Sequence, residues 1–201
     1  MHITLIQSTP NPIETISSIA SICYDSNPIV PFKLVEHLYK SGHHSVFEHI
    51  YFTFKIEGIS RACSHQLVRH RMCSFTQRSQ RYCNENGFEY ILPPTMKESA
   101  FSYDIADIAD MYGVYSENYP KEDARYVLPN ACCTDLYLSC NLRELIHICN
   151  ERLCSRAQWE IKELVKKMVE LIDPKLKFML VPKCKSGRII CNSPCKAKGE
   201  N

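Results

Sequence analysis

The sequence lacks the glycine-rich phosphate loops that many nucleotide-binding proteins share. Only six of its 201 residues are glycine, and neither the G-x-x-x-x-G-K pattern of a P-loop nor a Rossmann glycine fingerprint occurs in it. Both motifs hold phosphate through backbone N–H groups of a glycine-rich turn. Any phosphate ligand of this chain should therefore be held by side chains and by ordinary backbone amides.

Long apolar runs and a strong excess of charge are also missing. No apolar run reaches the roughly 20 residues that a membrane-spanning helix needs, and MHITLIQSTP at the start has neither the basic nor the apolar region of a signal peptide. The formal net charge is only +2, whereas sequence-general nucleic-acid binding normally requires a basic domain. We expect a cytoplasmic protein with no membrane and no nucleic-acid partner.

Cysteine is abundant, but its spacing favours neither disulfides nor zinc. None of the twelve cysteines forms a C-x-x-C pair, and cytosolic thiols stay reduced. Five lie among apolar neighbours and should act as small buried hydrophobic residues: Cys63, Cys132, Cys133, Cys140 and Cys149. In the tail, Cys184, Cys191 and Cys195 are loosely spaced for zinc and no fourth ligand is evident. We expect no bound metal, and a tail zinc site is the less favoured alternative.

Hydrophobic periodicity predicts both strands and helices, which indicates the α+β class. Strands are expected at 3–6, 50–59 and 88–92. Helices are expected at 30–41, 98–118 and 141–152, and a last one from about Ser155 to Asp173. Residues 133–140 fit a helix or a strand equally well. The pattern contains no repeat and no linker, so one domain is the simplest interpretation.

Several helix ends carry capping signals. Ser60 is expected to cap a helix that leads towards the arginines, and Gly42 suits the end of the helix at 30–41. Ser155 and Gln158 have the spacing of a capping box for the last helix. Trp159 in that helix is expected to pack against the core.

One stretch of the chain lacks acidic residues altogether. From Gly58 to Asn84 there is no Asp, Glu or Lys. Five arginines and two histidines lie there: Arg61, Arg69, Arg71, Arg78, Arg81, His65 and His70. Arginine alone, without lysine, favours a planar fork that grips phosphate or another oxyanion with two hydrogen bonds. The alternative is a charged surface paired with acids elsewhere, such as Glu160 or Asp104. A mononucleotide or a flavin dinucleotide is the ligand that fits best.

The same stretch carries a family resemblance. Arg69-His70-Arg71, seven residues and then Ser79 form the RHR-x7-S pattern of flavin-dependent thymidylate synthases. Other segments resemble that family in the right order: GHHSVFEH (42–49), ARYVLPNA (124–131), Asn141-Leu142-Arg143, Arg152 and RAQWEI (156–161). The resemblance covers roughly residues 40–172.

The resemblance implies a fold and a reaction. The fold is α+β, with an antiparallel-type sheet wrapped by helices, in a homotetramer whose active sites are shared between subunits. The reaction is the reductive methylation of dUMP to dTMP. In it 5,10-methylenetetrahydrofolate supplies the carbon, FAD carries the hydride and NADPH reduces the FAD. We accordingly expect a catalytic domain over residues 1–182 and a Lys/Cys-rich tail at 183–201.

The resemblance also assigns site residues. Implied FAD-binding residues are Ser45, Arg69, His70, Arg71, Gln77, Asn141, Leu142, Arg143 and His147. Implied dUMP-binding residues are Gln66, Leu67, Val68, Arg69, Gln77, Arg78, Ser79, Gln80, Arg81 and Arg152. The implied catalytic residues are Arg152 and His43, the latter matching an active-site histidine near the flavin.

Residue chemistry refines two of these roles. A guanidinium is not a base near neutral pH, so Arg152 is expected to stabilise the anionic uracil ring. No base lies near Ser79 in the sequence, and an unactivated hydroxyl is a weak nucleophile, so Ser79 is expected to bind the nucleotide. Because the stretch has no acidic residue, two anionic ligands, and not protein carboxylates, are expected to balance the charge of its arginines.

One departure from the family pattern leaves an alternative open. Asp135 stands where some members carry a basic residue that contacts dUMP. A flavin protein of related fold that has lost methylation is therefore a second possibility. A small RNA- or nucleotide-binding module built on the arginine stretch is a third.

Overall fold

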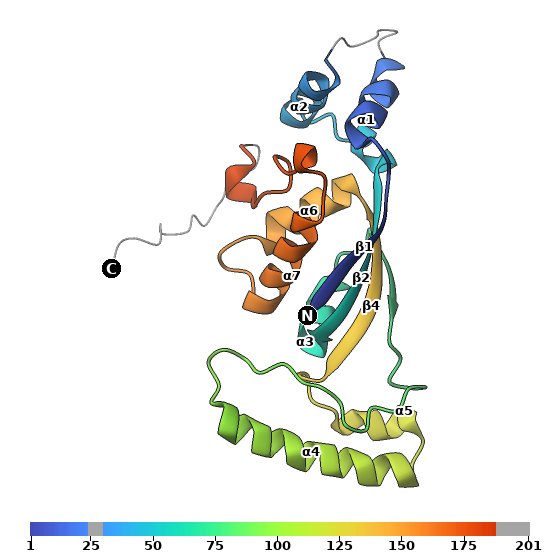
Figure 1. Ribbon diagram of the computed structural model, residues 1–201, viewed down its shortest axis with the longest axis vertical. Helices are drawn as coiled ribbons and strands as arrows, with labels where there is room; N and C mark the ends of the chain where they lie inside the picture. The colour runs from blue at the N-terminus through green and yellow to red at the C-terminus, as the bar shows by residue number, and fades with distance from the viewer. Residues whose placement is uncertain (24–29, 188–201) are drawn as a thin grey trace, which may run out of the picture. The chain divides into compact units, whose positions relative to one another are not determined.

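The chain combines a four-stranded antiparallel sheet with helices. The computed structural model describes residues 1–23 and 30–187. The strands lie in the order β1-β2-β4-β3 (Figure 1). They are β1 His2–Ser8, β2 Tyr51–Ser60, β3 Ser74–Gln77 and β4 Cys133–Asn141. The expected α+β class with an antiparallel sheet is confirmed.

Alternation of apolar side chains explains why the two central strands form. In β2 the side chains of Phe52, Phe54 and Ile56 are buried and the residues between them are more exposed. In β4 the side chains of Leu136 and Leu138 are likewise buried in alternation with more exposed residues. Residues 133–140, which fitted a helix or a strand equally well in the sequence, therefore form a strand. A two-residue period places every second side chain on the buried face of the sheet.

The helices agree well with the periodicity. They are α1 Pro12–Ser21, α2 Pro31–Ser41, α3 Arg61–Leu67, α4 Glu98–Asn118, α5 Lys121–Ala124, α6 Leu142–Arg152 and α7 Trp159–Glu170. Four short 3-10 helices are η1 Ser45–His49, η2 Arg125–Val127, η3 Pro174–Leu176 and η4 Lys183–Lys185. The helices expected at 30–41, 98–118 and 141–152 are confirmed. Across the described ranges, no helix has the length and apolar character needed to cross a membrane.

The capping predictions had mixed outcomes. The Ser60 hydroxyl accepts a hydrogen bond from Cys63 N at 3.0 Å, as expected. Gly42 ends α2 with a φ of 85°, which is a left-handed conformation that glycine adopts easily. The start of α7 was predicted wrongly, because Gln158 is its cap and accepts hydrogen bonds from two backbone amides of the first turn. Trp159 is consequently 41% exposed instead of packed.

Two other elements differ from the prediction. Residues 88–92 form no strand, and only an isolated bridge joins Tyr90 to Cys132. Pro93 and Pro94 follow directly and have no N–H to extend a ladder. Helix α1 was not predicted, although Pro12 stands in its first turn, where proline is favoured.

The described residues group into two compact units. Unit 1 comprises Met1–His2, Ile56–Arg69 and Phe75–Tyr137, and unit 2 comprises the remainder, from Ile3–Lys55, His70–Ser74 and Leu138 onwards. In unit 2, α6 packs on α7 and α1 packs on α2, as Figure 1 shows. In unit 1, α4 contacts α5 and η2. The prediction of one catalytic domain stays a prediction.

Most cysteines behave as the sequence indicated. Four of the five expected to be buried are so, namely Cys63, Cys132, Cys140 and Cys149, and Cys133 is half-buried. Burial raises the pKa of Cys132 to about 11 and raises that of Cys149 still more. Cys184 is exposed, whereas Cys191 and Cys195 lie outside the described residues.

Candidate active site

Unit 2 contains a pocket where several of the expected flavin-binding residues meet. The pocket has a volume of about 470 Å³ and is lined by Glu48, Met72, Asn141, Arg143, Glu144 and His147. Three of these, Asn141, Arg143 and His147, were assigned to FAD from the sequence. The i,i+4 spacing of Arg143 and His147 places them on one face of α6.

The start of α6 brings these side chains to the pocket. Asn141 ends β4 and caps α6, and its Oδ1 accepts a hydrogen bond from Glu144 N at 2.9 Å. The helix therefore begins immediately after the strand, and Asn141 and Arg143 can both line the pocket. Arg143 also forms an ion pair with Glu48 of η1. Sequence reasoning did not select Glu48, although it is the acid of the GHHSVFEH segment.

Arg152 and His70 are joined at the other end of α6. Arg152 is the last residue of the helix, and its Nε donates a hydrogen bond to His70 Nε2 at 3.0 Å. His70 is 4% exposed, and its Nδ1 lies 3.5 Å from Glu144 Oε1. Burial, helped by the charges of Arg152 and His147, lowers the pKa of His70 to about 4. The distance to Glu144 would suit an ion pair. Because His70 is neutral near pH 7, however, its contact with the Glu144 carboxylate is not an ion pair.

Arg69 and Arg71 point a different way from the histidine between them. Both side chains are exposed, and within the described residues neither has a hydrogen bond or an ion pair to another group. Arg69 belongs to unit 1 and Arg71 to unit 2. Exposed guanidinium groups with no protein carboxylate as partner suit an anionic ligand such as a flavin dinucleotide.

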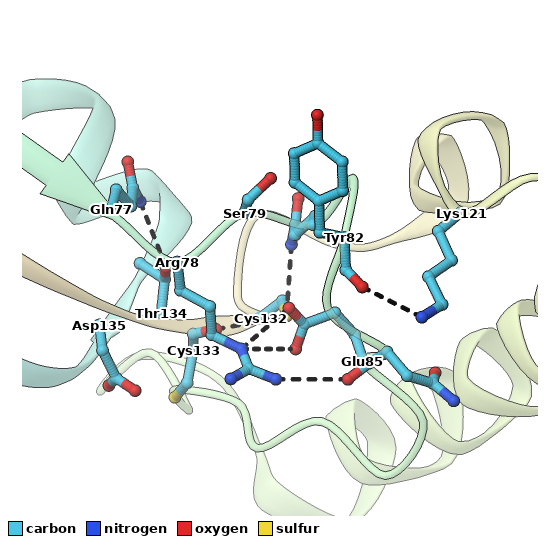
Figure 2. A network of polar contacts seen from close by, with 12 residues as sticks. Gln77, Arg78, Ser79, Tyr82, Glu85, Lys121, Cys132, Cys133, Thr134 and Asp135 are labelled. Atoms are coloured by element: carbon cyan, nitrogen blue, oxygen red, sulfur yellow. Dashed lines mark hydrogen bonds and ion pairs between the residues drawn. The ribbon is translucent and has the colours of Figure 1, made fainter.

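In unit 1 the arginines that follow are paired with acids. Arg78 Nε lies 3.1 Å from a carboxylate oxygen of Glu85, which is buried, and the hydrogen bond to Glu85 raises the pKa of Arg78 (Figure 2). Arg81 Nε lies 2.6 Å from Glu122 Oε2. The expectation that ligands, not protein carboxylates, balance the stretch is therefore wrong for Arg78 and Arg81. The acids differ from those considered in the sequence, since Glu160 and Asp104 are not the partners in these pairs.

Two glutamines next to these arginines form contacts with other segments of unit 1. Gln77 Nε2 donates to Ser64 Oγ at 3.0 Å and to Thr134 Oγ1 at 3.3 Å, and Figure 2 shows the second of these contacts. Gln80 Nε2 lies 3.8 Å from Cys132 Sγ. These bonds hold the segment in place and give the loop after β3 a defined course.

A second pocket, in unit 1, gathers cationic side chains. It has a volume of about 330 Å³ and is lined by Arg61, His65, Gln80, Arg125, Tyr126, Leu128, Pro129 and Asn130. Arg61 Nε is buried without a hydrogen-bond partner, and burial lowers the pKa of Arg61. A buried guanidinium N–H without an acceptor is costly unless a ligand supplies one. Arg125 was missed in the sequence, although it lies in the ARYVLPNA segment.

Other expected residues do not line these two pockets. His43 and Ser45 are exposed at the start of η1. Leu67 and Leu142 are fully buried, so their backbone alone could meet a ligand.

The side chain of Asp135 is occupied by a structural contact. Asp135 Oδ1 accepts a hydrogen bond from Gly58 N at 2.9 Å, where Gly58 has a φ of 66°. It also lines a third pocket of about 440 Å³ in unit 1, together with Glu57, Glu85 and Glu89. This concentration of carboxylates suits an anionic nucleotide poorly. In this chain the Asp135 carboxylate therefore serves a backbone contact.

Comparison with known proteins shows which family the chain belongs to. The model of the thymidylate synthase complementing protein family matches residues 4–176. A flavin-dependent thymidylate synthase of Geobacter sulfurreducens is 40% identical over 190 residues, which cover 86% of this chain and 82% of that protein. A flavin-dependent thymidylate synthase of Pyrococcus abyssi is 40% identical over 192 residues, covering 86% and 79%.

The fold is also that of a solved structure. A crystal structure of thymidylate synthase X from Helicobacter pylori with FAD and dUMP is similar, with a TM-score of 0.79 at 22% sequence identity. The similarity covers 92% of this chain and 99% of that one, and it confirms the expected fold. The chain belongs to the thymidylate synthase complementing protein family, the family of the flavin-dependent thymidylate synthases.

Proposed function

We propose that this chain is an FAD-dependent thymidylate synthase that methylates dUMP to dTMP. The observation that carries the proposal is the pocket of unit 2, where Asn141, Arg143 and His147 converge. Exposed Arg71 and the Arg152–His70 pair belong to the same unit. The names of the relatives and the FAD and dUMP of the Helicobacter pylori structure support the same activity.

The residues of unit 2 fit a flavin dinucleotide. Arg71 presents an exposed guanidinium, and Arg143 and His147 present hydrogen-bond donors at the pocket. When bound, FAD supplies the hydride that reduces the transferred one-carbon unit to a methyl group. The cationic side chains would favour its reduced, negatively charged form. Ser45 and His43 remain proposed contacts of the flavin and of the active site.

Unit 1 offers the groups for the nucleotide phosphate. Arg61, Arg125, His65 and Gln80 line a pocket of a size that suits a phosphate and part of its sugar, and the two arginines supply positive charge. Ser79 adds a hydroxyl close by in the chain. The other proposed dUMP contacts are Gln66, Leu67, Val68, Arg69, Gln77, Arg78 and Arg81, with the backbone contributing where the side chain is buried or paired.

Arg152 is proposed as the residue that polarises the substrate ring. An arginine side chain is not deprotonated in proteins, so Arg152 is not expected to remove a proton. Its Nε donates a hydrogen bond to His70, which is neutral and does not itself offset a positive charge. A positive charge beside the ring would stabilise the anionic form of uracil and make its C5 carbon a better nucleophile.

Further parts of the proposal concern co-substrates and assembly. We include NADPH and 5,10-methylenetetrahydrofolate as co-substrates, and a cytoplasmic homotetramer with shared active sites. Helix α4 supports self-association, because Tyr103, Met111 and Val114 are exposed on it and only Ile105 and Tyr112 are buried. Sedimentation of the purified protein tests the tetramer, and a monomer at all concentrations would contradict it.

One experiment decides the activity. The purified protein is loaded with FAD, its visible spectrum is recorded, and dUMP, methylenetetrahydrofolate and NADPH are added. We expect bound flavin and dTMP as a product. Bound flavin with NADPH oxidation but no dTMP would indicate instead a flavin protein that has lost methylation. A protein that retains no flavin and binds RNA with a steep salt dependence would indicate a nucleic-acid-binding module.

A further inference from the structure

The histidine of the Arg69-His70-Arg71 segment faces the protein interior. His70 is 4% exposed, whereas the arginines on either side of it are exposed. Its two ring nitrogens both meet protein groups: Nε2 accepts from Arg152 Nε at 3.0 Å, and Nδ1 lies 3.5 Å from Glu144 Oε1. A side chain with both nitrogens directed at the protein has a different task from one that holds a ligand.

The donor on Arg152 fixes where the proton of His70 lies. An arginine Nε always carries hydrogen, so His70 Nε2 must offer its lone pair. The neutral ring then carries its hydrogen on Nδ1, on the side of Glu144. The contact with Glu144 is long for a hydrogen bond, but a carboxylate oxygen 3.5 Å from Nδ1 favours the tautomer that carries hydrogen there.

We propose that His70 is a positioning residue that orients the guanidinium of Arg152 by accepting a hydrogen bond from its Nε, and that Glu144 keeps His70 in the tautomer able to do so. This inference rests on the proposed function, in which Arg152 stabilises the anionic substrate ring. His70 holds Arg152 without cancelling its charge, which a carboxylate at the same place would do. Arg152, His70 and Glu144 thus form a chain of contacts from α6, through the arginine segment, back to α6.

The geometry argues against a metal at the same place. In the part of the chain that the structure describes, His70, Glu144 and His147 are the group whose ligand atoms could surround an ion. A metal on His70 Nδ1 would leave hydrogen on Nε2, directly facing the N–H of Arg152. Two donors would then oppose each other at 3.0 Å. With neutral His70 as acceptor, the Arg152 Nε–H and His70 Nε2 both have a partner without an ion.

Kinetics of a double-mutant cycle test the positioning role. His70→Gln and Glu144→Gln are each made alone and together with Arg152→Ala, with His37→Gln and Glu163→Gln as exposed controls. We expect His70→Gln to lower kcat by on the order of 10- to 100-fold, because a displaced catalytic group loses its geometry. Flavin retention in the visible spectrum should stay unchanged. When Arg152→Ala is already present, adding His70→Gln should lower kcat further by less than about threefold.

A spectroscopic measurement gives a readout independent of turnover. Nitrogen NMR of histidine-labelled protein, with His70→Gln identifying the signal, should show His70 neutral and protonated on Nδ1 at pH 7. Arg152→Ala removes a donor and a positive charge, so it should move hydrogen between the nitrogens of His70 and raise its pKa. Glu144→Gln should shift the same signal while that of exposed His37 stays in place.

The outcomes separate this inference from the proposed function. Wild-type protein that makes no dTMP would reject the proposed function, whereas the NMR signal would still test the His70–Arg152 contact. Multiplicative losses in the double mutant, or loss of flavin in His70→Gln, would overturn the positioning role. A nitrogen NMR signal of His70 that is unchanged in Arg152→Ala, or that shifts when a chelator is added, would also overturn it. If His70→Gln does not fold, Glu144→Gln and Arg152→Ala give the same decision.

Discussion

Arg78 of unit 1 and Arg152 of unit 2 show two opposite ways of holding an arginine. Arg78 is paired with the buried carboxylate of Glu85, which offsets its charge. Arg152 donates to the neutral ring of His70, which does not offset its charge. Both contacts are close to 3 Å, but only the first pairs the arginine with a carboxylate. We therefore expect Arg78 to serve mainly the fold, and we propose that Arg152 serves the chemistry.

Removing Arg152 should have the largest effect on turnover. Loss of a charge that acts on the developing anion costs about 100- to 1000-fold in rate when measured for comparable groups. We expect Arg152→Ala to lower kcat for dTMP by a factor in that range and to keep its bound FAD. Product formation and the flavin spectrum are measured on the same preparation, with Arg156→Ala, an exposed arginine, as the control. A near-native rate in Arg152→Ala would remove the contrast between the two arginines.

Arg69 and Arg71 should matter most for flavin retention. Within the described residues they have no carboxylate partner, so a bound flavin would gain their full charge-assisted hydrogen bonds. Replacing either by Ala should weaken FAD binding by about 10-fold or more, equivalent to about 1.4 kcal/mol. Equilibrium titration with FAD measures the change, and exposed Lys175→Ala is the surface control. Unchanged FAD affinity in both variants would count against the proposed flavin site.

Removing Arg78 should instead lower stability. The substitution leaves the buried carboxylate of Glu85 without its cation, and Arg78 itself is partly exposed. We expect Arg78→Ala to reduce the free energy of unfolding by about 1–3 kcal/mol. The double variant Arg78→Ala with Glu85→Gln should recover part of this loss, because no buried charge then remains. Urea unfolding measures both, and equal stabilities of the single and double variants would contradict the assignment.

The neutral state of His70 should also appear in the pH dependence of stability. The pKa of His70 is about 4 in the folded chain against 6.5 for the ordinary side chain, so the unfolded state binds a proton first as pH falls. The contribution of neutral His70 to the free energy of unfolding is complete above pH 6.5 and is lost as the pH falls from 6.5 to about 4. It amounts to roughly 1–3 kcal/mol. The groups that act on the ring are Arg152, His147, Glu144 and Glu151. His70→Gln should flatten this part of the unfolding curve, whereas His37→Gln should leave it unchanged.

The smallest effects should be on thiol reactivity, where Cys149 in unit 2 differs from exposed Cys184. Burial raises the pKa of Cys149, so little thiolate forms and access is blocked. A colorimetric thiol reagent should label Cys184 at once and Cys149 only after unfolding. Rapid labelling of Cys149 in the native protein would show that α6 opens readily.

Local patterns were the predictable part of this chain. Alternation located β2, helical periodicity located α4 and α6, and the Ser60 cap was correct because each depends on a few neighbouring residues. Residues 133–140 stayed ambiguous because a short apolar run suits either element. The start of α7 was misjudged because both Ser155 and Gln158 can accept from a first turn, and only the path of the backbone chooses between them.

The contacts within the candidate site could not be predicted from local patterns. The family motifs selected Asn141, Arg143 and His147, which line one pocket, while their binding roles stay predictions. The bond between His70 and Arg152 joins residues 82 positions apart, and no local pattern reports such a pair. The carboxylate partners of Arg78 and Arg81 were missed for a related reason. Glu85 lies just after the acid-free stretch, and Glu122 lies beyond α4.

The cap on α6 restricts which residues this position can tolerate during evolution. Asn141 accepts from the first turn of the helix and also lines the pocket proposed for an anionic flavin. Aspartate would cap the helix equally well but would add a negative charge to the pocket. Alanine would leave the pocket neutral but would lose the cap. Asparagine meets both requirements, because it caps α6 and adds no negative charge to the pocket.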